Sequence, residues 1–337
     1  MRTEAAATPE PRLLPRATSV AAFALLAGLV ATAMPLVAYA GSLALFGLPH
    51  VLAELRYVDG RFGRRLPGSQ VAALVGLLGL AVGLRAVGLL GAMDVRDSYV
   101  AELGVVAVMA FVALPDLVAT PLRAVVALLV GASLAVGSWL APLLTLVLLA
   151  VLHNLTPIGF LLERTAGSRH QRTLAWSLPL LFLGVPLLLA TGWPSAWLAQ
   201  LGLFAPDTTF GSVGALARHR GVFVPEPVLA TSWATPLFTA VTYLQLMHYG
   251  AVLLVLPRLL APTEGGVDRP RLPWPRARVL GLVILGVGLV AAVSFVQDFR
   301  GTRTAYGLIA AVHAWIEIPL LLLALSPLLT RPRIART

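Results

Sequence analysis

The sequence predicts an all-α fold, a polytopic bundle of about ten transmembrane helices. Hydrophobic residues make up 58% of the 337 residues and charged residues only 12%, about half the charged fraction of an ordinary soluble domain. The mean hydropathy is +0.87. Uncharged stretches of about 18 or more residues recur, and each indicates a membrane-spanning helix, because a helix satisfies its own backbone hydrogen bonds in hydrocarbon. We therefore expect an integral membrane protein, located in a bacterial inner (cytoplasmic) membrane.

The first apolar stretch follows a polar tail over residues 1–17 and runs from Thr18 to Val58. At about 1.5 Å per residue it is roughly twice as long as a bilayer core, so it is expected to hold two spans. The small residues 38–41 are the expected turn between them. The same residues resemble a signal-peptidase site, and a cleaved leader over residues 1–40 is the alternative.

The remaining spans are expected wherever an apolar stretch is bounded by charged or helix-breaking residues. The ten expected ranges are 18–38, 41–58, 70–91, 99–117, 121–137, 139–161, 173–192, 234–257, 278–297 and 304–329. They form a single transmembrane domain over residues 18–329, followed by a basic tail over residues 330–337.

The arginines test this topology, because positive charge gathers in cytoplasmic loops. Ten spans place the N-tail, alternate loops with their adjacent helix ends, and the C-tail on one face, which then carries 19 arginines. The opposite face carries five: Arg96, Arg218, Arg220, Arg300 and Arg303. Both termini are therefore expected to be cytoplasmic. The longest loop, 193–233, bears Trp and Phe at both ends and is expected to lie along the outer interface.

Several chemistries are excluded by composition. The chain has no cysteine, so disulfides, thiolate metal sites and a cysteine nucleophile are excluded. All 25 basic residues are arginine, which excludes a lysine Schiff base. The net charge of +10 does not indicate nucleic-acid binding, because the arginines lie in short loops where membrane topology explains them.

Four of the six histidines fall inside expected spans whose helices all run in the same direction. They are His50, His153, His248 and His313. At about 1.5 Å per residue, they lie at depths of roughly 13 to 21 Å from the outer boundary, so they could meet in one layer near mid-membrane.

Two of these histidines carry a carboxylate one helical turn later: His50 with Glu54, and His313 with Glu317. The i, i+4 spacing places both side chains on one helix face. A carboxyl group in hydrocarbon is costly, so it indicates a functional site. Imidazole and carboxylate donors suit iron, zinc or manganese, with each carboxylate as a ligand or as the partner that orients a histidine. Haem held by His153 and His248 is the alternative.

Other polar residues have structural interpretations. Asn154, Thr156, Gln245 and Tyr249 adjoin the histidines in sequence and are expected to orient them or to join helices. Arg85 lies well inside the third span and is expected to pair with Glu102 or Asp116, with binding of an anionic group as the alternative. His170 and His219 lie in basic loops and are expected to be solvated.

The stretch GLPHVLAE, residues 47–54, resembles the G-x-P-H-x-x-x-D stretch of the Brp/Blh family of membrane carotene dioxygenases. Glu54 stands where that family has aspartate, and the paired H-x-x-x-H near the family's C-terminus has no counterpart here. The resemblance implies a polytopic fold, His50 as an iron ligand with Glu54 as its acidic partner, and an isoprenoid substrate.

The leading hypothesis is a metal-dependent membrane oxidoreductase or oxygenase that uses iron and acts on a lipid or isoprenoid. The four histidines would be its ligands, and Glu54 and Glu317 its catalytic carboxylates. Membrane lipid and an apolar small molecule are the expected partners. The alternatives are a transporter or proton-coupled carrier, a haem-binding protein, and a non-catalytic membrane factor.

Overall fold

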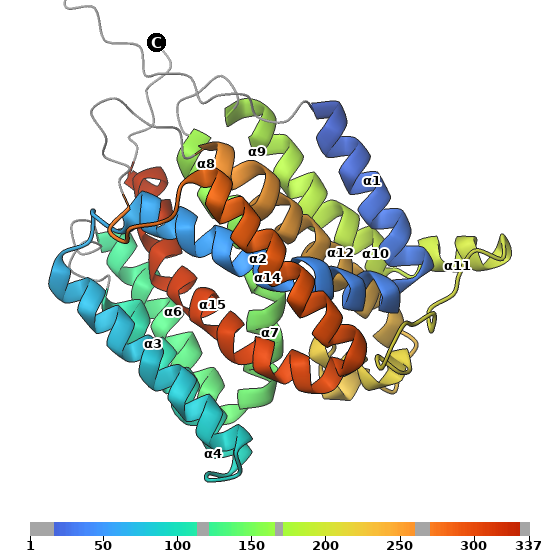
Figure 1. Ribbon diagram of the computed structural model, residues 1–337, viewed down its shortest axis with the longest axis horizontal. Coiled ribbons are helices and arrows are strands. Elements are labelled where there is room, and N and C mark those ends of the chain that lie inside the picture. The colour runs from blue at the N-terminus through green and yellow to red at the C-terminus, as the bar shows by residue number, and fades with distance from the viewer. Residues whose placement is uncertain (1–16, 113–120, 166–170, 260–269, 331–337) are drawn as a thin grey trace, which may run out of the picture.

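The computed structural model describes residues 17–112, 121–165, 171–259 and 270–330. Within these ranges the regular secondary structure is helical throughout, and the helices form one bundle (Figure 1). The α-helices are α1 (Ala17–Ala33), α2 (Pro35–Phe62), α3 (Gly68–Leu89), α4 (Val95–Val112), α6 (Pro121–Leu140), α7 (Pro142–His153), α8 (Thr156–Thr165), α9 (Gln171–Pro179), α10 (Val185–Ala190), α11 (Trp193–Gln200), α12 (Ala234–Gly250), α13 (Leu256–Leu259), α14 (Ala277–Gln297) and α15 (Phe299–Thr330). Two π-helical turns are η1 (Leu180–Gly184) and η5 (Ala251–Val255), and three short 3-10 turns, η2 (Leu216–Arg218), η3 (Arg220–Val222) and η4 (Glu226–Val228), lie in the long loop.

The bundle has the character of an integral membrane protein. Among the described residues, six helical segments are long and apolar enough to cross a membrane, and a seventh is added if the bent pair Trp176–Ala190 and Trp193–Gln200 is one span. Large apolar side chains face outward on peripheral helices, for example Leu282 and Val290 of α14, which are 70% and 69% exposed. Hydrocarbon is the solvent in which such a surface is stable.

Ten crossings with both termini cytoplasmic stay a prediction. Helices lie in all ten expected ranges, but α1 is shorter than the membrane-crossing length, and α4 carries Arg96, Asp97 and Glu102. The polar tails predicted over 1–17 and 330–337 lie almost wholly outside the described residues.

The prediction that residues 38–41 divide the first two spans is wrong. The chain breaks instead at Met34, where φ is −139° and ψ is 67°, and α2 begins at Pro35. A residue before proline is driven out of the helical conformation, whereas proline itself suits the first turn, because its missing N–H would have no partner there. The same device separates α6 from α7 at Ala141–Pro142. Residues 38–41 continue inside α2.

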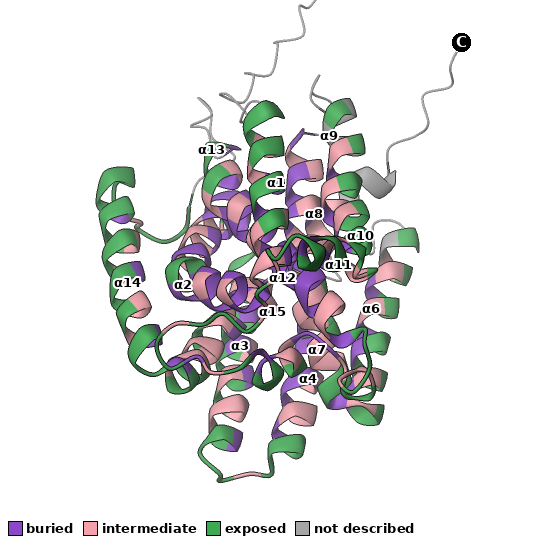
Figure 2. Cartoon of the chain, turned by 90° about the vertical axis from the view of Figure 1, so that its right-hand side faces the viewer, coloured by how far each residue is buried: buried purple, intermediate pink, exposed green. Residues whose placement is uncertain are grey.

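Two helices, α2 and α12, form the centre of the bundle and are mostly buried, whereas α3 and α14 lie at its periphery (Figure 2). α2 packs against α1, α12, α14 and α15. At Gly288 of α14, an added Cβ would lie 2.9 Å from Pro49 of α2, so glycine allows the close approach of these helices.

One end of the bundle is tied together by arginines and carboxylates. Arg61 of α2 forms an ion pair with Glu163 of α8. Asp59 accepts hydrogen bonds from the backbone of Arg271 at 3.0 Å and from the indole of Trp274 at 2.8 Å. These segments belong to the arginine-rich face that the sequence assigns to the cytoplasm.

The long loop 193–233 covers the opposite end of the bundle. Its backbone bonds to the junction of α1 and α2, where Ala205 N donates to Ala33 O at 2.8 Å, and Ser212 Oγ accepts from Phe299 N at 2.8 Å. The expectation that His219 is solvated is wrong. This side chain is buried and donates from Nε2 to Val213 O at 2.8 Å, because the loop packs onto Tyr39 and Phe299 instead of extending into solvent. His170 lies outside the described residues.

Candidate metal centre

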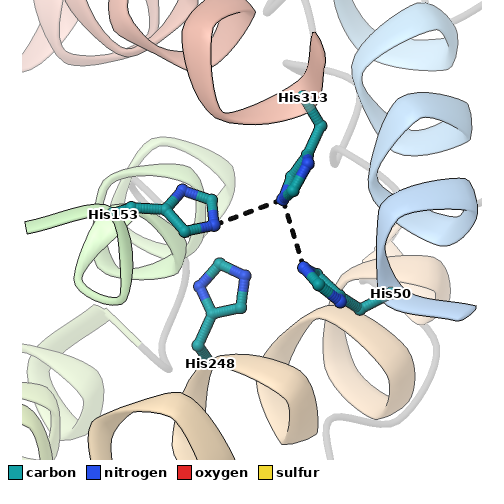
Figure 3. Close-up of side chains that lie close together, drawn as sticks. All are labelled: His50, His153, His248 and His313. Atoms are coloured by element: carbon teal, nitrogen blue, oxygen red, sulfur yellow. Dashed lines mark hydrogen bonds between the residues drawn. The ribbon is translucent and has the colours of Figure 1, made fainter. Parts of the chain in front are cut away.

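The four intramembrane histidines meet at one point in the middle of the bundle. His50 comes from α2, His153 from the end of α7, His248 from α12 and His313 from α15, and their rings converge (Figure 3). Their nearest ring nitrogens all lie within 4.8 Å of one another. His50, His248 and His313 are buried, and His153 is partly buried. The expectation that these four histidines meet is confirmed, and their depth in the membrane stays a prediction.

A helix break places His153 at the centre. α7 ends at His153, and the next helix begins at Thr156 with Pro157 in its first turn. Pro157 has no N–H to give to the carbonyl of His153 four residues earlier. The hydroxyl of Thr156 lies 2.8 Å from that carbonyl and replaces the missing donor. The helix can therefore end at His153 while the carbonyl oxygen of His153 still accepts a hydrogen bond from Thr156.

A π-helical turn adjoins His248. The turn η5 begins at Ala251, three residues after the histidine. π-helical turns insert one extra residue into a helix and occur frequently at functional sites. The turn changes the register of α12 relative to α13 next to the histidine cluster.

Hydrogen bonds fix the ring tautomers of two histidines. His50 donates from Nδ1 to Phe46 O at 3.0 Å, and His153 donates from Nδ1 to Glu317 Oε2 at 2.6 Å. In a neutral ring with its proton on Nδ1, Nε2 carries a bare lone pair. Both lone pairs point at Nε2 of His313, which lies 3.1 Å from His50 Nε2 and 3.2 Å from His153 Nε2.

The three facing Nε2 atoms have too few protons to hydrogen-bond to one another, so the space between them fits a bound cation. One proton on His313 Nε2 can serve His50 or His153 but not both, whereas a metal ion at the centre accepts every lone pair. For metal–nitrogen bonds of about 2.1 Å, two ligands are about 3.0 Å apart at a right angle and about 3.4 Å apart at the tetrahedral angle. The observed distances of 3.1 and 3.2 Å lie between these values.

His248 completes the set. Its ring centroid is 4.5 Å from that of His153 and 5.3 Å from that of His50. Neither of its ring nitrogens makes a well-formed hydrogen bond in the described structure, and the Glu54 carboxylate lies 3.6 Å from Nε2. A buried imidazole without a well-formed hydrogen bond is costly in hydrocarbon, and an ion would satisfy it. The short ring separations leave no slot for a macrocycle, which favours a single ion over haem.

Both predicted carboxylates lie beside the histidines. Glu317 bonds to His153 through Oε2, and its Oε1 lies 3.0 Å from the Thr156 hydroxyl. Glu54 is fully buried, and its Oε2 is 3.6 Å from His248 Nε2. Its carboxyl group also neighbours that of Glu317, and neither of its oxygens has a hydrogen-bond partner in the described structure. Each carboxylate thus lies beside one histidine of the cluster: Glu317 beside His153, and Glu54 beside His248.

The other polar residues that adjoin the histidines in sequence pack against the cluster or form hydrogen bonds within and between helices. Tyr249 lies against the ring of His50, with centroids 4.3 Å apart. Gln245 donates to Ser42 Oγ at 2.7 Å, and Asn154 donates to Ala150 O at 2.8 Å. Thr156, as described, joins His153 to Glu317.

Arg85 forms the predicted ion pair with Glu102. Nε of Arg85 donates to Oε2 of the carboxylate at 2.9 Å, and the Trp315 indole donates to Oε1 at 2.8 Å. The Glu102 side chain is fully buried. The guanidinium of Arg85 also lies 5.6 Å from the centroid of the Trp315 ring.

A mostly apolar cavity of about 830 Å³ reaches the cluster. Its wall includes His50, His153, His313 and Glu317, together with leucine and valine side chains of α6, α7 and α15. His248 and Glu54 do not line the cavity and are fully buried behind it. A volume of this size is typical of pockets that hold one small organic ligand.

Sequence reasoning missed two features of the site. Tyr306 lines the cavity beside the cluster, although its position seven residues before His313 already places it on the same face of α15. The π-helical turn after His248 has no recognisable signal in the sequence.

Comparisons of this chain with models of known protein families, with curated proteins and with solved structures find no match.

Proposed function

We propose that this protein is an integral membrane metalloenzyme, an oxygenase that uses iron to oxidise a lipid or isoprenoid. The observation that supports it most strongly is the meeting of four histidines beside an apolar cavity. In His50 and His153, Nδ1 donates a hydrogen bond away from the cluster, so the lone pair on Nε2 faces its centre.

The donor set favours iron over zinc. Four imidazoles around zinc would fill its tetrahedral coordination and give a closed, structural site. A cavity that reaches three of the four histidines instead suits an ion with more coordination positions than the protein fills. Imidazole-rich sites without thiolate suit iron.

The cavity favours an apolar substrate. Leucine and valine are the most numerous side chains in its wall, and they lie beside the histidines of the cluster. The stretch GLPHVLAE, which resembles that of membrane carotene dioxygenases, supplies both His50 and Glu54. Cleavage of a carbon–carbon double bond by dioxygen into two carbonyl groups balances without an added reductant, and bound iron would supply the activation of dioxygen.

The chain's own residues hold and orient this site. The four histidines would bind the ion through their inner nitrogens. Glu317 accepts a hydrogen bond from Nδ1–H of His153 and so fixes the ring orientation, which raises the basicity of the ligand nitrogen. Glu54 lies against His248 and supplies negative charge beside the cation. The apolar wall excludes water from the reacting chain.

The proposal is tested by isotope labelling. Purified protein in lipid nanodiscs is loaded with ferrous iron without oxygen, mixed with a bacterial lipid extract, and exposed to ¹⁸O₂. We expect ¹⁸O in a lipid-derived carbonyl product, lost when His153 and His248 are both changed to alanine and retained in His219→Gln. Iron-loaded protein that consumes no oxygen and labels no lipid contradicts the proposal.

A further inference from the structure

A partly buried arginine lines the same cavity at a distance from the histidines. Arg303 of α15 is part of the cavity wall, next to Tyr39 and Thr304. Its NH1 atom is buried and has no hydrogen-bond partner, and within the described residues no carboxylate forms an ion pair with it. A guanidinium with an unsatisfied buried N–H is costly unless an anion occupies the space beside it.

Positive charge is concentrated around this arginine. Burial lowers the pKa of the nearby His219, the carbonyl of Val213 opposes that effect, and the charges of Arg303, Arg300 and Arg218 lower the pKa further. In the predicted topology these arginines belong to the few on the face opposite the arginine-rich one. The preference of positive charge for cytoplasmic loops therefore does not account for them.

One face of α15 connects Arg303 to the candidate metal centre. Residues on this face that line the cavity are Arg303, Tyr306, Gly307, Ala310, His313 and Glu317. Ten residues separate Arg303 from His313, which is about 15 Å along the helix, the reach of an extended chain of roughly a dozen carbons. Between them, Gly307 leaves the cavity open, since an added Cβ there would meet nothing within 4 Å.

We propose that Arg303 binds the anionic head group, carboxylate or phosphate, of a single-chain lipid whose apolar tail extends along α15 to the histidine cluster. The chemical role of the cluster rests on the proposed function, but binding of the head group does not require it. A cavity of about 830 Å³ suits one chain and one head group. Tyr39, which bonds to Arg303, borders the same head-group space.

The test is a binding measurement with a matched pair of ligands on full-length protein in detergent. Palmitoleate and palmitoleyl alcohol share one unsaturated chain and differ only in the head group, an anionic carboxylate in one and a neutral hydroxyl in the other. We expect wild-type protein to bind the acid about 10- to 100-fold more tightly than the alcohol, the range that a charge-assisted hydrogen bond supplies. Arg303→Gln is expected to remove this preference, with binding of the alcohol unchanged.

Two controls separate the possible causes. Arg96→Gln removes an exposed arginine of the same face and is expected to keep the preference. Millimolar inorganic phosphate is expected not to displace the acid, because free phosphate lacks the tail. Equal binding of acid and alcohol by the wild type, an unchanged preference in Arg303→Gln, or displacement by free phosphate would overturn the proposal.

The result is independent of the proposed oxygenase activity. Metal content is measured in the same samples, and Arg303→Gln is expected to retain that of the wild type. An Arg303-dependent preference in protein without metal supports this inference while counting against the proposed function. Metal-dependent oxidation of neutral and anionic lipids alike, unchanged by Arg303→Gln, would support the proposed function and contradict the head-group role of Arg303.

Discussion

Glu317 accepts a hydrogen bond from the outer ring nitrogen of His153, with Oε2 2.6 Å from Nδ1. The inner nitrogen of the same ring, Nε2, lies 3.2 Å from Nε2 of His313. The carboxylate thus determines which nitrogen of His153 faces the centre of the cluster. Thr156 contacts the same carboxylate at 3.0 Å and limits its rotation.

Glu317→Gln is expected to weaken metal binding about 10- to 100-fold, because loss of a carboxylate partner lowers the basicity of a histidine ligand. The amide is nearly the same size, so the fold is expected to persist. Competition with a chelator of known affinity measures the effect. Unchanged metal affinity in a folded Glu317→Gln variant would show that the contact does not orient a ligand.

Arg85→Met is expected to destabilise the protein by about 3 to 5 kcal/mol, because it leaves the fully buried carboxylate of Glu102 without its cation. The double variant Arg85→Met/Glu102→Gln is expected to be less destabilised than the single variant, since no buried charge remains. Denaturant unfolding in detergent, followed by tryptophan fluorescence, measures both. A double variant as unstable as the sum of its single changes would contradict the coupling.

Gly307→Phe is expected to block the cavity between Arg303 and the histidines. An added Cβ at this glycine meets nothing within 4 Å, so the substitution is expected to enter the cavity and leave the metal content at the wild-type value, while lipid turnover falls about tenfold or more. Gly286→Phe on the exposed face of α14, where the space is also open, is the matched control and is expected to leave turnover unchanged. Full turnover in Gly307→Phe would mean that the substrate does not use this cavity.

The helices and the histidine cluster were predictable because both follow from the properties of hydrocarbon. Long uncharged stretches must be helical in a bilayer, and polar side chains within them are too costly to face lipid. His50, His153, His248 and His313 therefore had to find one another or other polar partners. The i, i+4 spacing of His313 and Glu317 correctly placed the carboxylate near the cluster, although its hydrogen bond goes to His153 on another helix.

Features that depend on packing between distant segments were not predictable. The small residues 38–41 allow either a turn or close helix packing, and the proline after Met34 decides in favour of packing. His219 appears solvated in a basic loop, yet the loop folds back and buries it. The unsatisfied NH1 atom of Arg303 is visible only when the cavity around it is known.

Metal content tests the central claim most directly. Full-length protein, purified without chelators, is analysed by inductively coupled plasma mass spectrometry beside His153→Ala/His248→Ala and the control His219→Gln. We expect about one transition-metal ion per chain in the wild type and in His219→Gln, and none in the double alanine variant. Wild-type protein that holds no stoichiometric metal after loading, or a double variant that retains it, would contradict the assignment of the four histidines as a metal site.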